Sequence, residues 1–194
     1  MNTMLRMAAL GLGLISLLTA AGAEAGGWAP PQAVVPPSAL HGVHGLAVLD
    51  DRRVLAGTVV GNDMWEVDRA TGAAKVYIPA PEGQADDIAI GPRGELAWTS
   101  YLQGVIRYRE TEGAPIRVLA KDLTGINSLA FDMKTGRLCA SRVVLGDVIW
   151  EIDVAGLKSP WMIAKDLGGF MGFEVGPARP DLYRRSTNWT QYRA

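Results

Sequence analysis

The residues best suited to chemistry occupy one repeated place in the sequence. His44, Asp86 and Asn127 each lie two positions before an apolar residue that opens a short β-rich segment, and Met171 holds the same place in a fourth copy. Carboxylate and amide oxygens, with an imidazole as a further ligand, suit a hard divalent cation such as calcium, which takes roughly six to eight oxygens. The alternative is that these residues form turns and line a water-filled channel.

Asp86 is followed directly by Asp87. Because adjacent strand residues face opposite ways, only one of the two can reach a channel, and the other is expected to accept hydrogen bonds from loop amides. The pair is therefore not a two-carboxylate dyad, and of the two Asp86 is the candidate catalytic residue. Two further candidate metal ligands are Glu82, whose Pro-x-Gly surroundings also suit an ordinary turn, and His44. His44 is a candidate general base as well, with a hydrogen-bonded loop residue as the alternative.

A repeat of about 42 residues positions these candidates. The apolar anchors Leu46, Ile88, Leu129 and Phe173 mark its four copies. The first three copies each contain four short segments rich in β-branched and aromatic residues, separated by turn formers. The expected strands are 46–48, 54–58, 64–68 and 75–78; 88–90, 95–99, 106–110 and 116–119; and 129–131, 137–141, 149–153 and 161–164. This pattern predicts an all-β protein, a β-propeller built from four-stranded blades.

The fourth copy stops half-way. It keeps its register as far as Asp181-Leu182-Tyr183, and residues 184–194 show no alternation. We therefore expect about three and a half blades of a larger ring, with 184–194 as an aberrant tail left by a fragment or a change of reading frame. The alternatives are a four-bladed ring closed by the N-terminal arm and an irregular β-sandwich.

The N-terminal segment has the features of an export signal. A single charge, Arg6, precedes an apolar run that ends in the small residues Ala21-Gly22-Ala23, which predicts a signal peptide over residues 1–23 and a periplasmic or secreted protein. A retained N-terminal anchor is the alternative. Prolines predict an extended arm over 24–40, followed by the partial propeller over 41–183. No later stretch approaches the roughly 20 apolar residues of a membrane span.

Composition excludes several other classes of protein. A net charge of −1 and an isoelectric point near 6.1 argue against a nucleic-acid partner, because phosphate binding requires a basic surface. The single cysteine, Cys139, excludes an intrachain disulfide and a cysteine-based zinc site.

Three blade-start motifs carry a family resemblance. GQADDIA (83–89), GINSLAF (125–131) and LGGFMGF (167–173) resemble those of the SMP-30/gluconolactonase/LRE-like propeller superfamily, and NHL-type and virginiamycin-lyase-like propellers share such patterns. The resemblance implies six blades around one divalent cation, calcium or zinc, held by a Glu, two Asn and an Asp. It also implies that this Asp acts as general base in the hydrolysis of sugar lactones.

Carried over position by position, the resemblance makes Asn127 a metal ligand and Asp86 a second one. Met171 stands where a further Asn is expected, and the blade that would carry the catalytic Asp has no counterpart in the repeat. The predicted function is thus an exported, metal-dependent lactone hydrolase that acts on a small molecule, with an inactive truncated product as one alternative. Another alternative is a non-catalytic periplasmic propeller that binds a ligand or a protein.

Overall fold

The structure, a computed structural model, describes residues 29–35, 40–144, 146–168 and 171–176, and the backbone of residues 182–183 and 192–193. The chain divides into two units, Met1–Gln32 and Ala33–Ala194, and every strand that the structure describes lies in the second. The predicted signal segment 1–23 lies outside the described residues. In the predicted arm, the described residues 29–35 and 40 form neither strand nor helix.

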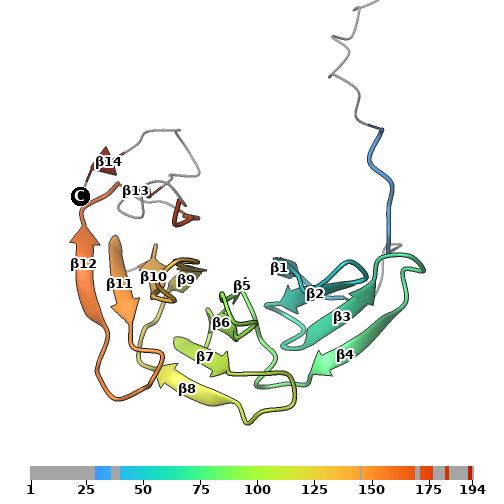
Figure 1. Ribbon diagram of the computed structural model, residues 1–194, viewed down its shortest axis with the longest axis horizontal. Coiled ribbons are helices and arrows are strands. Elements are labelled where there is room, and N and C mark those ends of the chain that lie inside the picture. The colour runs from blue at the N-terminus through green and yellow to red at the C-terminus, as the bar shows by residue number, and fades with distance from the viewer. Residues whose placement is uncertain are drawn as a thin grey trace, which may run out of the picture. The chain divides into compact units, whose positions relative to one another are not determined.

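Twelve strands form three four-stranded antiparallel sheets, in the orders β1-β2-β3-β4, β5-β6-β7-β8 and β9-β10-β11-β12. The sheets follow one another in chain order, with β1, β5 and β9 along the inner side and β4, β8 and β12 along the outer side (Figure 1). Their bounds are β1 Val43–Val48, β2 Arg53–Thr58, β3 Met64–Asp68, β4 Ala74–Ile78, β5 Asp87–Ile90, β6 Leu96–Ser100, β7 Val105–Arg109, β8 Arg117–Ala120, β9 Ile126–Phe131, β10 Leu138–Arg142, β11 Val148–Ile152 and β12 Trp161–Lys165. Within the described parts of the chain we find no helix, and so none that could cross a membrane.

The repeat predicted this architecture correctly. Each of the twelve predicted strands falls inside an observed strand or within one residue of it, and the three sheets are three propeller blades. The fourth copy differs from the prediction, because residues 171–176 form no strand, although Phe173 is buried. The short strand β13 (Leu182–Tyr183) stands at the predicted second-strand position, but it pairs with β14 (Tyr192–Arg193) of the predicted tail.

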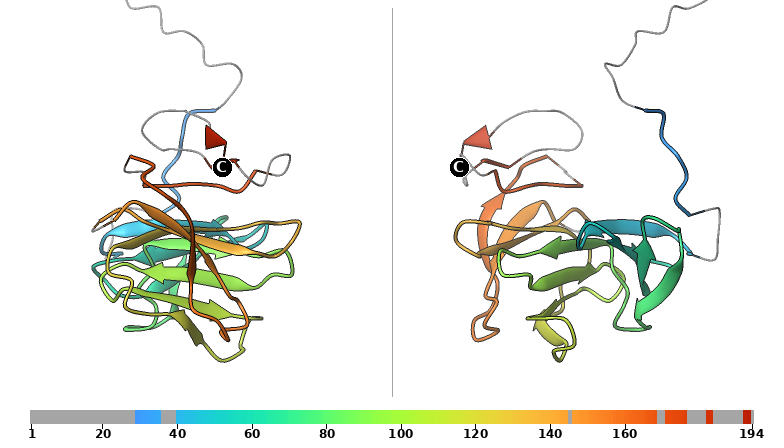
Figure 2. Two further views of the ribbon diagram at one scale, coloured as in Figure 1. Left: turned by 90° about the vertical axis from the view of Figure 1, so that its left-hand side faces the viewer. Right: turned by 45° about the vertical axis from the view of Figure 1, so that its right-hand side comes forward.

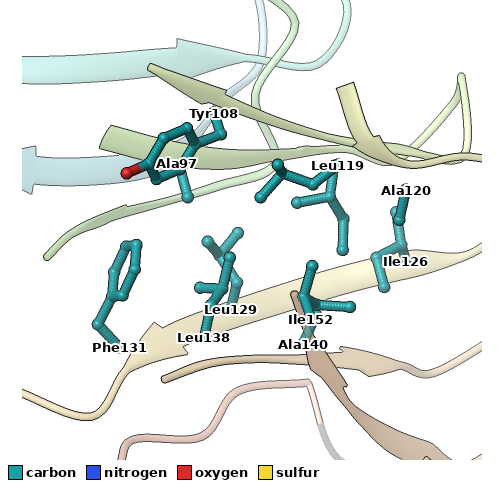
Figure 3. Packing of buried hydrophobic residues seen from close by; sticks show 11 residues of the cluster. Ala97, Tyr108, Leu119, Ala120, Ile126, Leu129, Phe131, Leu138, Ala140 and Ile152 are labelled. Carbon is teal, nitrogen blue, oxygen red and sulfur yellow. The ribbon is translucent and has the colours of Figure 1, made fainter. Parts of the chain in front are cut away.

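Successive blades are held together by apolar side chains. One cluster joins the first and second blades. In it, Met64 and Ile78 of the first blade pack with Ile88 and Trp98 of the second. A second cluster joins the second and third blades, where Tyr108 and Leu119 face residues of β9 and β10, as Figure 3 shows. Since a twisted sheet with two apolar faces must bury both, packing against neighbours is what stabilises each blade. The two turned views show the same succession of sheets (Figure 2).

Side chains at the start of each inner strand also connect one blade to the next. The Asp87 carboxylate of β5 accepts a hydrogen bond from the backbone N–H of Leu129 in β9, at 2.9 Å. Ser128, the equivalent residue of β9, donates its hydroxyl to the carbonyl oxygen of Met171, at 2.6 Å. In β1 the equivalent residue is Gly45, where a Cβ would lie 3.1 Å from the Cα of Asp87. A side chain at this position would therefore require the neighbouring strand to shift by a few tenths of an ångström.

Candidate functional site

The inner strands bring the predicted channel residues into one cavity. His44 in β1, Asp86 just before β5, Asn127 in β9 and Met171 all line a cavity of about 270 Å³. They meet because they hold the same position in successive blades, whose inner strands lie side by side. The rest of the described lining is Val59, Tyr101, Leu102, Val143 and Val144.

Asp86 is the centre of the polar contacts in this cavity. Its Oδ1 lies 3.1 Å from the Nδ1 of His44, and its Oδ2 accepts a hydrogen bond of 2.7 Å from the Nδ2 of Asn127. The Oδ1 of Asn127 in turn accepts a hydrogen bond of 3.2 Å from the Ser128 hydroxyl. A continuous chain of polar contacts therefore runs from His44 across three blades.

The side chains of Asp86 and His44 differ in their exposure to solvent. The Asp86 side chain is only 6% exposed, whereas the His44 side chain is 56% exposed. Burial raises the pKa of the Asp86 carboxyl, and the nearby His44 opposes that rise. The pair thus combines a buried carboxyl with an imidazole that solvent and ligands can reach.

Asp87 lies outside the described cavity lining and binds backbone amides, as the alternation of strand side chains predicted. Its carboxylate accepts hydrogen bonds from the backbone N–H groups of Leu129 and Ile88. The acceptor role was expected, but the donors are strand amides instead of loop amides, and one belongs to the next blade. Burial raises the pKa of Asp87 to about 6, although these two amides favour the charged form.

Glu82 is the one predicted ligand that the structure does not place in the cavity. Its side chain is exposed and lies outside the described lining, while its backbone carbonyl accepts a hydrogen bond from the Trp98 indole. Sequence reasoning also overlooked Ser128, whose position after Asn127 is equivalent to that of Asp87 after Asp86. The same alignment of blade starts contained that signal.

The described residues do not form a ready cation site. Both oxygens of Asp86 lie against nitrogen atoms, and Asn127 points its amide nitrogen towards Asp86. No three His, Cys, Asp or Glu side chains gather as a possible metal cluster anywhere in the described ranges. Catalytic zinc usually has three ligands of the His, Cys or carboxylate type, of which His44 and Asp86 supply two, and calcium takes roughly six to eight oxygens.

Comparisons with known proteins place the fold. A chain of the nidogen/laminin complex superposes with a TM-score of 0.62 at 18% identity, over 77% of this chain and 66% of that one. A catalytically inactive histidine-to-alanine variant of virginiamycin B lyase from Staphylococcus aureus, with quinupristin, gives 0.59 at 14% identity, over 82% and 58%. A proposed gluconolactonase gives 0.60 at 13% identity, over 80% and 59%.

These similarities confirm the fold that the blade-start motifs predicted, a β-propeller like those of gluconolactonases and virginiamycin B lyases. The chain spans less than two thirds of the length of these structures. No family model matches the sequence, and no curated protein does.

Proposed function

We propose that this propeller binds a small lactone or ester in the cavity and hydrolyses it, with His44 as the general base and Asp86 as the residue that orients it. The observation that carries this proposal is the contact of 3.1 Å between the His44 Nδ1 and the Asp86 Oδ1 inside the cavity. The gluconolactonase-like fold supports a lactone as the substrate class. In the similar lyase, replacement of a histidine by alanine gives an inactive protein.

The chemistry follows from the geometry of the pair. In the proposed step the Asp86 carboxylate, 3.1 Å from the His44 Nδ1, keeps the proton on Nδ1, so that the lone pair of Nε2 is free to act as the base. Nε2 removes a proton from water while the water oxygen attacks the lactone carbonyl carbon. The ester C–O bond then breaks, the imidazolium returns its proton to the leaving oxygen, and the product is one hydroxy acid per lactone and water consumed. Asp86 remains ionised and stabilises the imidazolium.

The metal centre implied by the family resemblance, with calcium or zinc, stays a prediction. The step above uses no metal, because the described residues do not complete a cation site. Export to the periplasm or the medium likewise stays a proposal, based on the sequence of residues 1–23.

The test is lactone hydrolysis by the full chain and its variants. His44→Ala is expected to lower kcat/KM by about 100- to 10,000-fold, the usual contribution of a general base, and Asp86→Asn should also lower kcat because the imidazole loses its orientation. His41→Ala is the matched control, since His41 is the chain's other histidine and lies outside the described cavity lining. Equal activity of His44→Ala and His41→Ala would contradict the proposal.

Chelation separates the two catalytic schemes. With His44 as the base, activity should survive dialysis against a chelator. Activity that disappears on chelation and returns with calcium or zinc would instead support the predicted metal-dependent hydrolase.

The second candidate is a non-catalytic propeller that binds a small molecule. It is favoured by the internal pairing of the site, because Asn127 hydrogen-bonds to both Asp86 and Ser128, and Ser128 also donates to the Met171 carbonyl oxygen. Binding of a lactone in calorimetry, with no turnover of any lactone in a panel from sugar lactones to alkyl γ-lactones, would select this candidate.

A further inference from the structure

The loops that follow the second strand of each blade repeat an apolar pair. Each loop places two apolar or aromatic residues immediately after the strand, at equivalent positions of the three blades, namely Val59-Val60, Tyr101-Leu102 and Val143-Val144. Five of these six residues line the cavity, together with Met171. We call the six lining residues the apolar collar; they are Val59, Tyr101, Leu102, Val143, Val144 and Met171.

The apolar collar is partly open to solvent. Leu102 is 64% exposed, and Val144 and Met171 are also exposed, around a cavity whose buried end is polar. Exposed apolar side chains that gather at one place mark binding surfaces more often than chance. Here they are continuous with His44 and Asp86, so a ligand at the candidate site contacts both kinds of surface.

The polar part of the cavity has little capacity for a polyhydroxylated ligand. Both oxygens of Asp86 are engaged by His44 and Asn127, and the Asn127 oxygen accepts the Ser128 hydroxyl. Among the nine described lining residues only His44, Asp86, Asn127 and Tyr101 carry side-chain N or O atoms, and Asp86 and Asn127 are buried. A sugar lactone would have several hydroxyl groups without partners, and each unpaired group that is buried opposes binding.

Charge narrows the ligand class further. No lysine or arginine belongs to the described cavity lining, and the one acidic residue there is Asp86. An anionic ligand would therefore meet a carboxylate without a compensating cation. The volume of about 270 Å³ also limits the ligand to a small molecule.

Taken together, these features lead us to propose that the ligand is an uncharged lactone or ester with an aliphatic chain, its carbonyl group at His44 and its chain on the apolar collar. The inference rests on the proposed function for the reacting group, and adds the specificity for the chain. It departs from the sugar lactones that the family resemblance implies.

The test compares affinities along a series of lactones, by calorimetry on both the wild-type chain and His44→Ala. The series runs from γ-butyrolactone through γ-hexalactone and γ-octalactone to γ-decalactone, with glucono-δ-lactone as the polar member. Each added methylene should tighten binding about two- to fourfold until the collar is covered, since a buried methylene is worth up to about 0.8 kcal/mol. A constant affinity along the series, no binding of γ-decalactone, or tighter binding of glucono-δ-lactone would overturn the inference.

Variants of the collar test the place where the chain binds. Leu102→Ser and Val144→Ser should each lower the ratio of γ-decalactone to γ-butyrolactone affinity by about tenfold. Val118→Ser is the matched control, because Val118 is similarly exposed, at 54%, but lies on β8 outside the cavity lining. An unchanged ratio in both collar variants would overturn the assignment.

These results are independent of catalysis. If His44→Ala keeps the chain-length dependence and wild type shows no turnover, the chain specificity stands and the hydrolase proposal fails. If wild type hydrolyses every lactone of the series at the same kcat/KM and binds them equally, the hydrolase proposal stands and the chain specificity fails.

Discussion

The first and third blades put the same residue type at the same repeat position in very different surroundings. Leu46 in β1 is 62% exposed, whereas its equivalent Leu129 in β9 is 4% exposed. Leu129 packs in the cluster between the second and third blades. On the face of β1 that carries Leu46, the structure describes no further sheet, and Leu46 lines an apolar cavity of about 300 Å³ with Val34, Val35 and Leu40.

This difference shows that burial in a repeat fold depends on the neighbouring copy as much as on the residue. The backbone pairing is the same in both blades, since Leu46 pairs with Ala56 and Leu129 with Ala140. Among the described residues, Leu129 has a preceding blade to pack against and Leu46 has none. The stability of such arrays is approximately a sum of contributions within each repeat and contributions between neighbouring repeats. Leu129 contributes to packing between blades, whereas the exposed Leu46 contributes little of it.

Truncating these two leucines should therefore give the largest contrast. Leu129→Ala is expected to lower the free energy of unfolding by about 2–5 kcal/mol, as for other buried leucines. Leu46→Ala should change it by no more than about 0.5 kcal/mol, because the side chain is mostly exposed. Denaturant unfolding of the two variants measures both values, and equal losses would mean that the faces of the two blades are covered alike.

The residue before each leucine gives a second contrast, in the dependence of stability on pH. Asp87 connects the second blade to the third through the Leu129 amide, while the first blade has Gly45 at this place. Because the folded-state pKa of Asp87 is raised from 3.8 to about 6, the folded state binds the proton more tightly than the unfolded state. The contribution of Asp87 to stability is then greatest below pH 4 and decreases, by up to about 3 kcal/mol, as the pH rises from 4 to above 6.

Asp87→Asn should remove this fall, which unfolding curves measured between pH 4 and pH 7 will detect. Asp132→Asn is the control of opposite sign. The Thr135 hydroxyl and nearby amides hold the pKa of Asp132 below its ordinary value, so its contribution is lost as the pH decreases. A fall of the same size in Asp87→Asn and wild type would show that Asp87 is not its origin.

The smallest contrast concerns the polar contacts between blades. Arg53 of the first blade forms an exposed ion pair of 3.0 Å with Glu112 of the second. Arg117 of the second blade instead donates to the carbonyl oxygens of Val154 and Ala155 in the third. Glu112→Gln should reduce stability by about 0.2–1 kcal/mol in low salt and by less in high salt, because salt screens exposed charges.

Arg117→Gln provides the comparison, since its partners are neutral carbonyl groups. Its effect on the unfolding free energy should change less with salt than that of Glu112→Gln. An effect of Glu112→Gln that persists unchanged in high salt would show that the contact is not mainly electrostatic.

The sequence predicted the blades well because strand and turn signals are local. Alternating apolar residues and turn formers placed all twelve strands, and equal spacing placed His44, Asp86 and Asn127 on one cavity. Spacing could not predict which atoms of these residues meet, because hydrogen bonds depend on side-chain rotamers. The sequence predicted Asp86 and Asn127 as metal ligands, but it could not predict that the Asn127 amide nitrogen donates a hydrogen bond to Asp86.

The fourth copy shows where local signals are insufficient. Phe173 has the right residue type at the right distance and is buried beside Cys139 and Ile149, yet residues 171–176 form no strand. A strand requires hydrogen bonds to a partner strand, and β13 pairs with β14 instead. The burial of apolar side chains follows from the sequence pattern, whereas strand formation depends on which partner strand is available for hydrogen bonding.

The exposed apolar side chains of Leu46 and Val48 on the first blade have a consequence for engineering this chain. Arrays of repeats stay soluble when their terminal repeats act as caps with a polar outer side. Leu46 and Val48 instead place exposed apolar side chains on the first blade. Polar substitutions at these two positions would convert the first blade into a capping repeat, at little cost in stability because neither side chain is buried.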